Sequence, residues 1–119
     1  MYRLPEDFDG MFFVGRTIEQ VCFSQNQLSM HFDHQIVLTI ESAFSLGETD
    51  SASSNKLQRI PVSNSDLMQL LGFRVTNVRI EEQNTLCLIF QNGKEFRCYD
   101  DANDYESYQI RNGAKTIIV

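Results

Sequence analysis

The sequence predicts a mostly-β fold, an antiparallel sandwich or partly open barrel built from two pseudo-symmetric repeats joined by one short helix. Three observations support this prediction. Apolar and polar residues alternate over several short runs, as in strands that bury one face. Turn-forming residues separate these runs at intervals of about 8–12 residues. The apolar pattern of one half recurs in the other half, which indicates an internal repeat.

The chain has the size of one domain. Its 119 residues can enclose one hydrophobic core but are too few for two ordinary ones. A hydrophobic fraction of 42% excludes a chain that is disordered throughout. We therefore expect residues 1–119 to form a single domain.

The repeat is anchored by two glycines, Gly15 and Gly72. After each glycine the apolar residues follow in the same order around a Gln-Asn pair, with one extra residue before the second pair. The matched residues include Val21 with Val78, Leu28 with Leu86, Phe32 with Phe90, and Ile60-Pro61-Val62 with Ile117-Ile118-Val119. The sequence thus predicts a first repeat over 15–62, a helical connector over 63–71 and a second repeat over 72–119.

The first strand of each repeat interrupts the alternation at the same place. Ile18 and Val21 are three residues apart, as are Val75 and Val78, before the period of two resumes. This spacing predicts a β-bulge or a strand start at that point in both halves.

The second strands, 28–32 and 86–90, are apolar at alternate positions, which predicts half-buried strands. Asn92-Gly93 follows the second of them and predicts a type I′ hairpin turn, because that turn needs positive φ at both central residues. Asp33-His34 occupies the corresponding place in the first repeat. Asn112-Gly113 predicts another turn before a closing strand over 115–119.

The alternating runs predict roughly eight to ten strands in total. Two further segments are predicted to be a loop and a helix. Residues 45–56 are polar and poor in β-forming residues, which predicts a mobile loop. Residues 63–71 start with Ser and Asn as capping residues and are followed by Gly72, which predicts a short helix. We expect this helix to close one end of the sheets or to cover an edge.

The net charge of −6 argues against anionic partners. The basic residues are scattered singly along the sequence, so a phosphate backbone or an anionic membrane surface would be repelled. No stretch reaches the roughly 18 apolar residues of a membrane span. We expect no nucleic acid and no membrane as partners.

The three cysteines lack the CxxC spacing of redox and zinc sites. Cys22, Cys87 and Cys98 lie within apolar-alternating runs, which predicts buried thiols in a reducing compartment. The amino terminus lacks the apolar region of a secretion signal. A cytoplasmic location is therefore expected.

The sequence contains no motif that predicts catalysis or metal binding. His31 alternates out of phase with its apolar neighbours and His34 falls in a turn, so the two imidazoles make a weak metal site. The run 100–106 holds four carboxylates but lacks the central glycine and the spacing of a calcium loop. Nucleophile elbows and glycine-rich phosphate loops are missing too. We expect no catalytic residues, no metal and no cofactor.

The densest aromatic and acidic patch predicts a contact surface for another protein, because tyrosine offers large contact area at low entropic cost. Its members are Tyr99, Asp100, Asp101, Asp104, Tyr105, Glu106 and Tyr108. Tyr108 also fits a core position, since Tyr and Ile alternate over 106–110.

Two short motifs near the carboxyl end carry a resemblance. They are Phe90-Gln91-Asn92-Gly93-Lys94-Glu95-Phe96 and Tyr105-Glu106-Ser107-Tyr108. The chain resembles a class of small bacterial proteins of unknown function, in which an F-x-(D/N)-G hairpin precedes a Y-E-x-(W/Y) segment. The resemblance implies a fold rather than an activity. Some compact acidic bacterial β-proteins of this kind are immunity proteins that block a toxin.

We therefore expect a non-catalytic module, monomer or homodimer, that binds another protein, with a basic toxin domain as one such partner. The alternative is a small-molecule-binding protein or enzyme with a cleft between the two repeats. A deep pocket lined by convergent polar groups would favour the alternative. Dimerisation through an edge strand is a third possibility.

Overall fold

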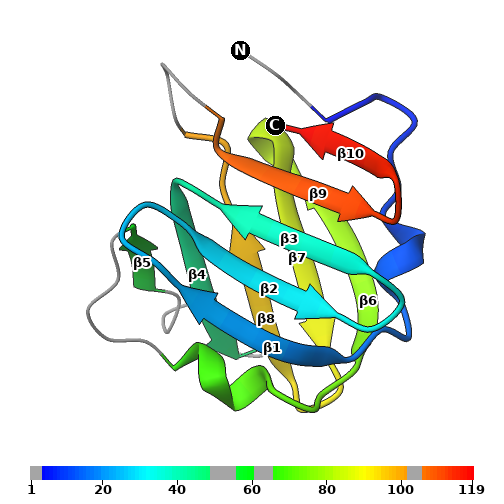
Figure 1. The fold of residues 1–119 in the computed structure, drawn as a ribbon, viewed down its shortest axis with the longest axis vertical. Coiled ribbons are helices and arrows are strands. Elements are labelled where there is room, and N and C mark those ends of the chain that lie inside the picture. Colours follow the sequence, from blue (N-terminus) through cyan, green and yellow to red (C-terminus); the bar gives the residue numbers. More distant parts are fainter. Residues whose placement is uncertain (1–3, 49–55, 61–65, 102–105) are drawn as a thin grey trace.

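The computed structural model describes residues 4–48, 56–60, 66–101 and 106–119. These residues form two five-stranded antiparallel sheets packed face to face (Figure 1). The first sheet has the strand order β1-β2-β3-β9-β10 and the second has the order β5-β4-β8-β7-β6. Both sheets are open at their edges, so the predicted mostly-β antiparallel fold is confirmed as a sandwich rather than a closed barrel.

The described residues contain ten strands, most of which follow the predicted runs. They are β1 (Ile18–Phe23), β2 (Leu28–Phe32), β3 (Ile36–Ile40), β4 (Ala43–Glu48), β5 (Lys56–Arg59), β6 (Val75–Glu81), β7 (Thr85–Phe90), β8 (Lys94–Cys98), β9 (Tyr108–Asn112) and β10 (Lys115–Ile118). Three short 3-10 turns accompany them: η1 (Met11–Phe13), η3 (Leu67–Leu70) and η4 (Glu82–Asn84).

Each half of the chain contributes strands to both sheets. In the first half, β1, β2 and β3 lie in the first sheet, and β4 and β5 lie in the second. In the second half, β6, β7 and β8 lie in the second sheet, and β9 and β10 cross to the first. Figure 1 shows β9 beside β3 and the second sheet behind.

The predicted irregularities are present in both first strands. The register of β1 against β2 shifts between Ile18 and Gln20, and that of β6 against β7 shifts between Val75 and Asn77. A shift of this kind is a β-bulge, which bends the strand and restores the alternation beyond it. The prediction from the spacing of the apolar residues is confirmed.

β1 and β6 meet at their beginnings. Thr17 and Arg74 form an isolated antiparallel bridge between them. Two backbone hydrogen bonds flank the bridge, from Gly15 N–H to Val75 O (2.8 Å) and from Gly72 N–H to Ile18 O (2.9 Å). Both glycines have a positive φ, 88° and 83°, a conformation that side chains with a Cβ rarely adopt.

The core lies between the sheets and is filled by the inward-facing residues of both. The alternating strands place Leu28, Phe32, Leu86 and Phe90 there, all at most 3% exposed. Phe13 joins them from the N-terminal segment, with its ring 5.4 Å from that of Phe32. Burial of these large apolar side chains is the main source of stability for such a domain.

Short 3-10 turns close two places at the edges of the sandwich. η3 buries Leu67 and Leu70, and η1 buries Phe13. The predicted helix over 63–71 is only the four-residue turn η3 in the described part of this segment, because the backbone is already extended at Leu71. Residues 63–65 lie outside the described residues. η1 was not predicted, because one turn has too few residues to show periodicity.

The expected loop over 45–56 begins later than predicted. Residues 45–48 belong to β4, which pairs with both β8 and β5, and 49–55 lie outside the described residues. The closing strand of the first half is Lys56–Arg59, where Leu57 faces Ser45. Ile60 lies just beyond β5, whereas Ile117 and Ile118 lie within β10. Pro61 and Val62 lie outside the described residues, so the predicted match of Ile60-Pro61-Val62 with the end of the chain stays a prediction.

The hairpin turns lie where expected, but one has a different type. Among the described residues at the β7–β8 turn, Gly93 has a positive φ of 84° whereas Asn92 does not. The Gly93 N–H donates to Phe90 O at 3.0 Å, which gives a three-residue connection instead of the predicted type I′ turn. In the first half, His34 and Gln35 take the positive φ values.

Candidate functional site

Tyr108, one of the tyrosines predicted to contact a partner, belongs to the core. It is fully buried at the start of β9, and its hydroxyl donates to the Asn84 carbonyl oxygen at 2.6 Å. Burial raises the pKa of Tyr108 above its usual range. Tyr108 therefore cannot contact a partner of the folded protein. The alternative prediction, that Tyr108 occupies a core position, is confirmed.

Two carboxylates of the acidic segment, Asp100 and Asp101, form hydrogen bonds and an ion pair within the protein. Asp100 accepts hydrogen bonds from Ser107 Oγ (2.8 Å) and Asn84 Nδ2 (3.2 Å). Asp101 accepts a hydrogen bond from Ser42 and pairs with Arg59 at 2.9 Å. They tie together the connections by which the chain crosses between sheets, so this part of the segment is not a freely presented acidic surface.

The remaining members of the predicted patch differ in position. Tyr99 is half-buried, and its hydroxyl lies 2.8 Å from Ser45 Oγ. Glu106 is half-buried and faces Glu41, whose pKa is raised by burial and then by repulsion from Glu106. Asp104 and Tyr105 lie outside the described residues.

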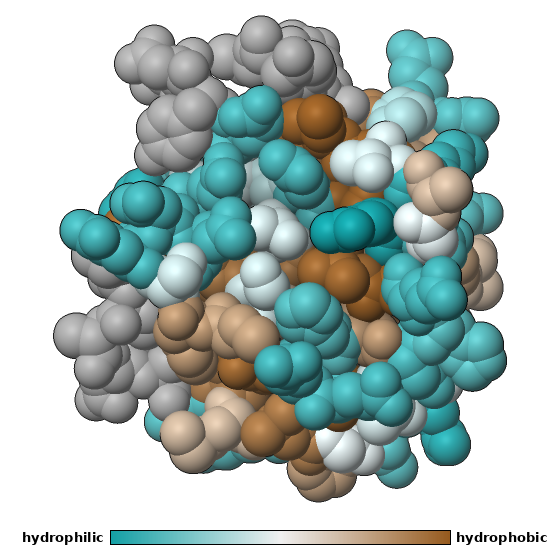
Figure 2. All heavy atoms as spheres, viewed as in Figure 1, coloured by the Kyte–Doolittle hydropathy of each residue, from teal (hydrophilic) through white to brown (hydrophobic). Residues whose placement is uncertain are grey.

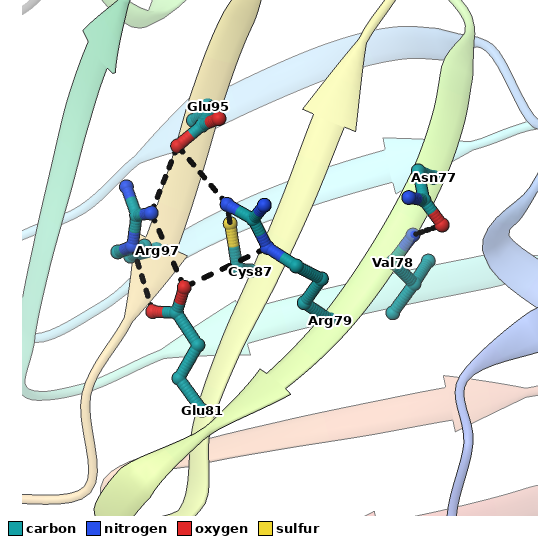
Figure 3. Close-up of polar contacts among 7 residues, drawn as sticks. All are labelled: Asn77, Val78, Arg79, Glu81, Cys87, Glu95 and Arg97. Carbon is teal, nitrogen blue, oxygen red and sulfur yellow. Dashed lines mark hydrogen bonds and ion pairs between the residues drawn. The ribbon is translucent and has the colours of Figure 1, made fainter. Parts of the chain in front are cut away.

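A cluster of charges on the outer face of the second sheet was not predicted. Arg79 on β6, Cys87 on β7 and Arg97 on β8 lie directly opposite one another across the three strands. Glu81 and Glu95 are two residues away from Arg79 and Arg97 on the same strands, so they project from the same face. Figure 3 shows the four charged side chains converging over Cys87; we call these four the ion cluster.

Each arginine of the ion cluster contacts both carboxylates. Arg97 Nε lies 2.8 Å from Glu81 Oε1, and Arg97 Nη2 lies 2.8 Å from Glu95 Oε1. Arg79 Nε lies 3.7 Å from Glu81 Oε2, and Arg79 Nη2 lies 3.4 Å from Glu95 Oε1. The geometry is tighter at Arg97, which makes charge-assisted hydrogen bonds of ideal length to both partners.

Burial divides the ion cluster into a covered and an open half. The side chains of Arg97 and Glu95 are 14% and 6% exposed, whereas those of Arg79 and Glu81 are 48% and 32% exposed. Hydrogen bonding to Glu81 raises the pKa of Arg97 above its usual range. One nitrogen of Arg97, Nη1, is buried without a hydrogen-bond partner. An unpaired buried donor costs free energy that pairing would recover.

The thiol at the centre of the ion cluster is not an activated nucleophile. Cys87 is fully buried, and burial raises its pKa although both arginines act in the opposite direction. Cys98 is buried in the core, and its pKa is raised well above the usual range. Both thiols therefore stay protonated at neutral pH, as expected for buried cysteines. Cys22, predicted to be buried as well, is only half-buried, so the prediction is wrong for this residue.

The fold itself does not require charges on this face. On the first sheet, Cys22 pairs with Ser29, and Ser29 with Thr39, just as Arg79 pairs with Cys87 and Cys87 with Arg97. The corresponding outer face of the first sheet therefore carries short, uncharged side chains at the places taken by the two arginines. Figure 2 shows that face, where mainly hydrophilic residues surround smaller hydrophobic areas.

A signal for the ion cluster was present in the sequence. Arg79-Ile80-Glu81 and Glu95-Phe96-Arg97 each place opposite charges two residues apart in a strand. The period of two puts both charges of each pair on one face. Their meeting depends on the pairing of β6, β7 and β8, which local patterns do not give.

The residues weighed as metal ligands are far from forming a site. His31 is half-buried on the outer face of the first sheet, and His34 lies in the following turn, 3.4 Å from Asp33. The part of the chain that the structure describes holds no group of three or more His, Cys, Asp or Glu residues placed to bind a metal ion. Within it, no helix is long and apolar enough to cross a membrane.

Comparison with known proteins gives a family but no activity. A family model described as "Family of unknown function (DUF6188)" matches residues 11–119. Neither the curated proteins nor the solved structures contain a match. The match agrees with the predicted resemblance to proteins without assigned function; the two motifs and the bacterial origin named there stay predictions.

Proposed function

Since the chain belongs to DUF6188, a family without an assigned activity, we propose from its geometry that it is a non-catalytic protein-binding module. Its contact surface is the outer face of the second sheet, centred on the ion cluster. A basic protein is the favoured partner because the chain carries a net charge of −6, which attracts basic surfaces over a distance. A toxin domain neutralised by this chain would be one such partner.

The observation that carries the proposal is the ion cluster itself. Buried charges cost desolvation energy, and well-packed apolar residues at such places are often as stable or more stable. The first sheet has no such charges at the corresponding positions, since short uncharged residues such as Ser29 and Thr39 occupy its outer face there. A specific contact is one reason for a protein to keep such a cluster, because fixed charges set the orientation of a partner.

The exposure of the ion cluster fits a contact role. Arg97 and Glu95 are largely buried and pair with the more exposed Glu81 and Arg79, which a partner can reach. Tyr99, bonded to Ser45, lies on the same face, because Ser45 pairs with Arg97. A fixed arginine and a tyrosine are residue types enriched where binding energy concentrates.

The alternative of a small-molecule site between the two halves receives no support from the interior. Within the described residues, the space between the sheets is filled by buried apolar side chains such as Leu38, Leu88, Phe96 and Ile110. A cleft does exist elsewhere, at the N-terminal segment, and is considered below.

Affinity capture with matched variants tests the proposal. The full chain is immobilised and exposed to extracts of its source organism at several salt concentrations, and captured proteins are identified by mass spectrometry. Arg79→Glu and Arg111→Glu make the same change of charge at exposed arginines on opposite outer faces. We expect Arg79→Glu to lose the partner although it makes the chain more acidic, because it breaks the pairs with Glu81 and Glu95 that fix the contact surface; Arg111→Glu, which adds the same negative charge elsewhere, should retain the partner.

Binding of the purified partner then gives the decisive numbers. Isothermal titration calorimetry should show an affinity for the native chain that falls as salt increases, because exposed charges are screened. Failure to capture any protein at all salt concentrations, or equal losses for the two variants, would contradict the proposal.

A further inference from the structure

A cleft lies between the N-terminal segment and the closing hairpin β9–β10. Its volume is about 240 Å³, and it is partly open to solvent. In Figure 1 the N-terminal segment, in dark blue, runs past β10 before η1 begins. The cleft thus lies between the segment that precedes the first repeat and the last hairpin of the second repeat, and none of its lining residues belongs to the ion cluster.

Part of the cleft wall is apolar. Phe8 and Phe12 line one side, and Ile110 and Ile117 line the other. The Phe8 and Phe12 rings pack edge to face with centroids 5.9 Å apart, and Phe12 in turn lies 4.7 Å from Phe13 of the core. The aromatic wall is therefore anchored to the interior rather than loosely attached.

Charges of both signs line the same cleft. Asp7 and Asp9 lie on the N-terminal segment, and Lys115 opens β10. Among the described residues, neither Asp7 nor Lys115 takes part in an ion pair or a side-chain hydrogen bond, and Asp9 uses one carboxylate oxygen for the Met11 N–H at 3.0 Å. The cleft thus offers the Asp7 carboxylate, the second oxygen of Asp9 and the Lys115 ammonium group to a ligand.

We propose that this cleft binds a small zwitterion with an apolar side chain, such as a free apolar α-amino acid. The carboxylates would hold the ligand's ammonium group, Lys115 would hold its carboxylate, and the phenylalanine rings would cover its side chain. A volume below the range of about 300–1,000 Å³ typical of drug-sized ligands selects a ligand of this size. The proposal is independent of the proposed protein contact, which uses the other sheet.

Nuclear magnetic resonance tests the proposal on the full chain with ¹⁵N labelling. L-Phenylalanine and L-leucine are the probes, and N-acetyl-L-phenylalanine and L-phenylalaninamide each remove one of the two charges. We expect saturable shifts of backbone amides confined to residues 7–12 and 110–117 with the free amino acids. Both derivatives should bind more weakly, because each loses one electrostatic contact.

Two pairs of variants supply matched controls. Lys115→Gln should weaken L-phenylalanine binding about two- to fivefold, whereas Arg111→Gln, which removes the same charge from the outer face, should not. Asp7→Asn should weaken it where Glu6→Gln, an exposed neighbour outside the cleft, does not. The resonances of the core report whether each variant is folded.

Several results would overturn the proposal. They are the absence of saturable shifts at millimolar ligand, shifts spread over both sheets, equal binding of the derivatives and the free amino acid, and equal effects within either pair of variants.

Discussion

Replacing Arg97 with threonine tests how the ion cluster is held together. Threonine is the residue at the corresponding place on the first sheet, Thr39, so the strand tolerates its shape. The change removes both 2.8 Å contacts of Arg97 and leaves Glu95, only 6% exposed, with Arg79 at 3.4 Å as its remaining cation. Glu95 would then be a buried carboxylate with weak compensation.

The expected loss follows from this burial. Removing one partner of a buried ion pair costs about 3–5 kcal/mol. The variant also removes the buried, unpaired Nη1 of Arg97, which returns some of that cost, so we expect a net loss of about 3 kcal/mol. Such a loss is a large part of a typical total stability of about 5–15 kcal/mol. Arg79→Thr should cost less than about 1 kcal/mol, because that arginine is 48% exposed and solvent screens it.

Urea unfolding followed by far-ultraviolet circular dichroism measures both variants, with a common slope m as evidence of two-state behaviour. The double variant Glu95→Val, Arg97→Thr places the residues of the first sheet in the second. We expect it to be more stable than the sum of the two single changes predicts, because no buried charge is left unpaired. Equal losses for Arg79→Thr and Arg97→Thr, or strictly additive effects in the double variant, would refute the reasoning.

Three further predictions concern titratable groups. Glu41→Gln should raise the melting temperature at pH 7, because burial and then Glu106 raise the pKa of Glu41 in the folded state. This gain should shrink as the pH falls through the raised folded-state pKa and vanish below the unfolded pKa of about 4.3, where the carboxyl is neutral in both states; a pH-independent gain would contradict it. Tyr108→Phe should cost about 1–2 kcal/mol in urea unfolding because the buried Asn84 carbonyl loses its 2.6 Å donor; an unchanged midpoint would count against this hydrogen bond. Cys98 should stay unlabelled by a thiol reagent in the native protein and react once unfolded, as peptide mass mapping can show, because it is buried and its pKa is raised; rapid native labelling would disprove this.

The strands were predictable because they follow from local alternation. Leu28, Met30 and Phe32 recur at every second position, and all three are buried in β2. The bulges were predictable for the same reason, since a spacing of three residues between apolar side chains is visible in the sequence alone. Local rules of side-chain direction were sufficient for these features.

The candidate site was not predictable, because it depends on pairings between distant strands. The acidic segment contains Asp100 and Asp101, which look solvated in the sequence but bind Ser107 and Arg59 once the strands cross between sheets. The ion cluster arises only when β6, β7 and β8 align in register. Charge patterns along a strand indicate which side chains share a face, but they do not indicate which strands become neighbours.

The exchange of strands between the two sheets has a consequence for how the chain acquires its structure. A fragment that ends between β5 and β6 would hold three strands of one sheet and two of the other, with the strands that should lie beside them missing. Neither this fragment nor the one that starts at β6 could form the hydrophobic core alone. A chain cleaved between β5 and β6 should therefore fold only when both fragments are mixed. In the intact chain, β3 can pair with β9, and β4 with β8, only after the long segments between these strands have closed. Because the closure of long loops slows folding, we expect this protein to fold slowly for its size.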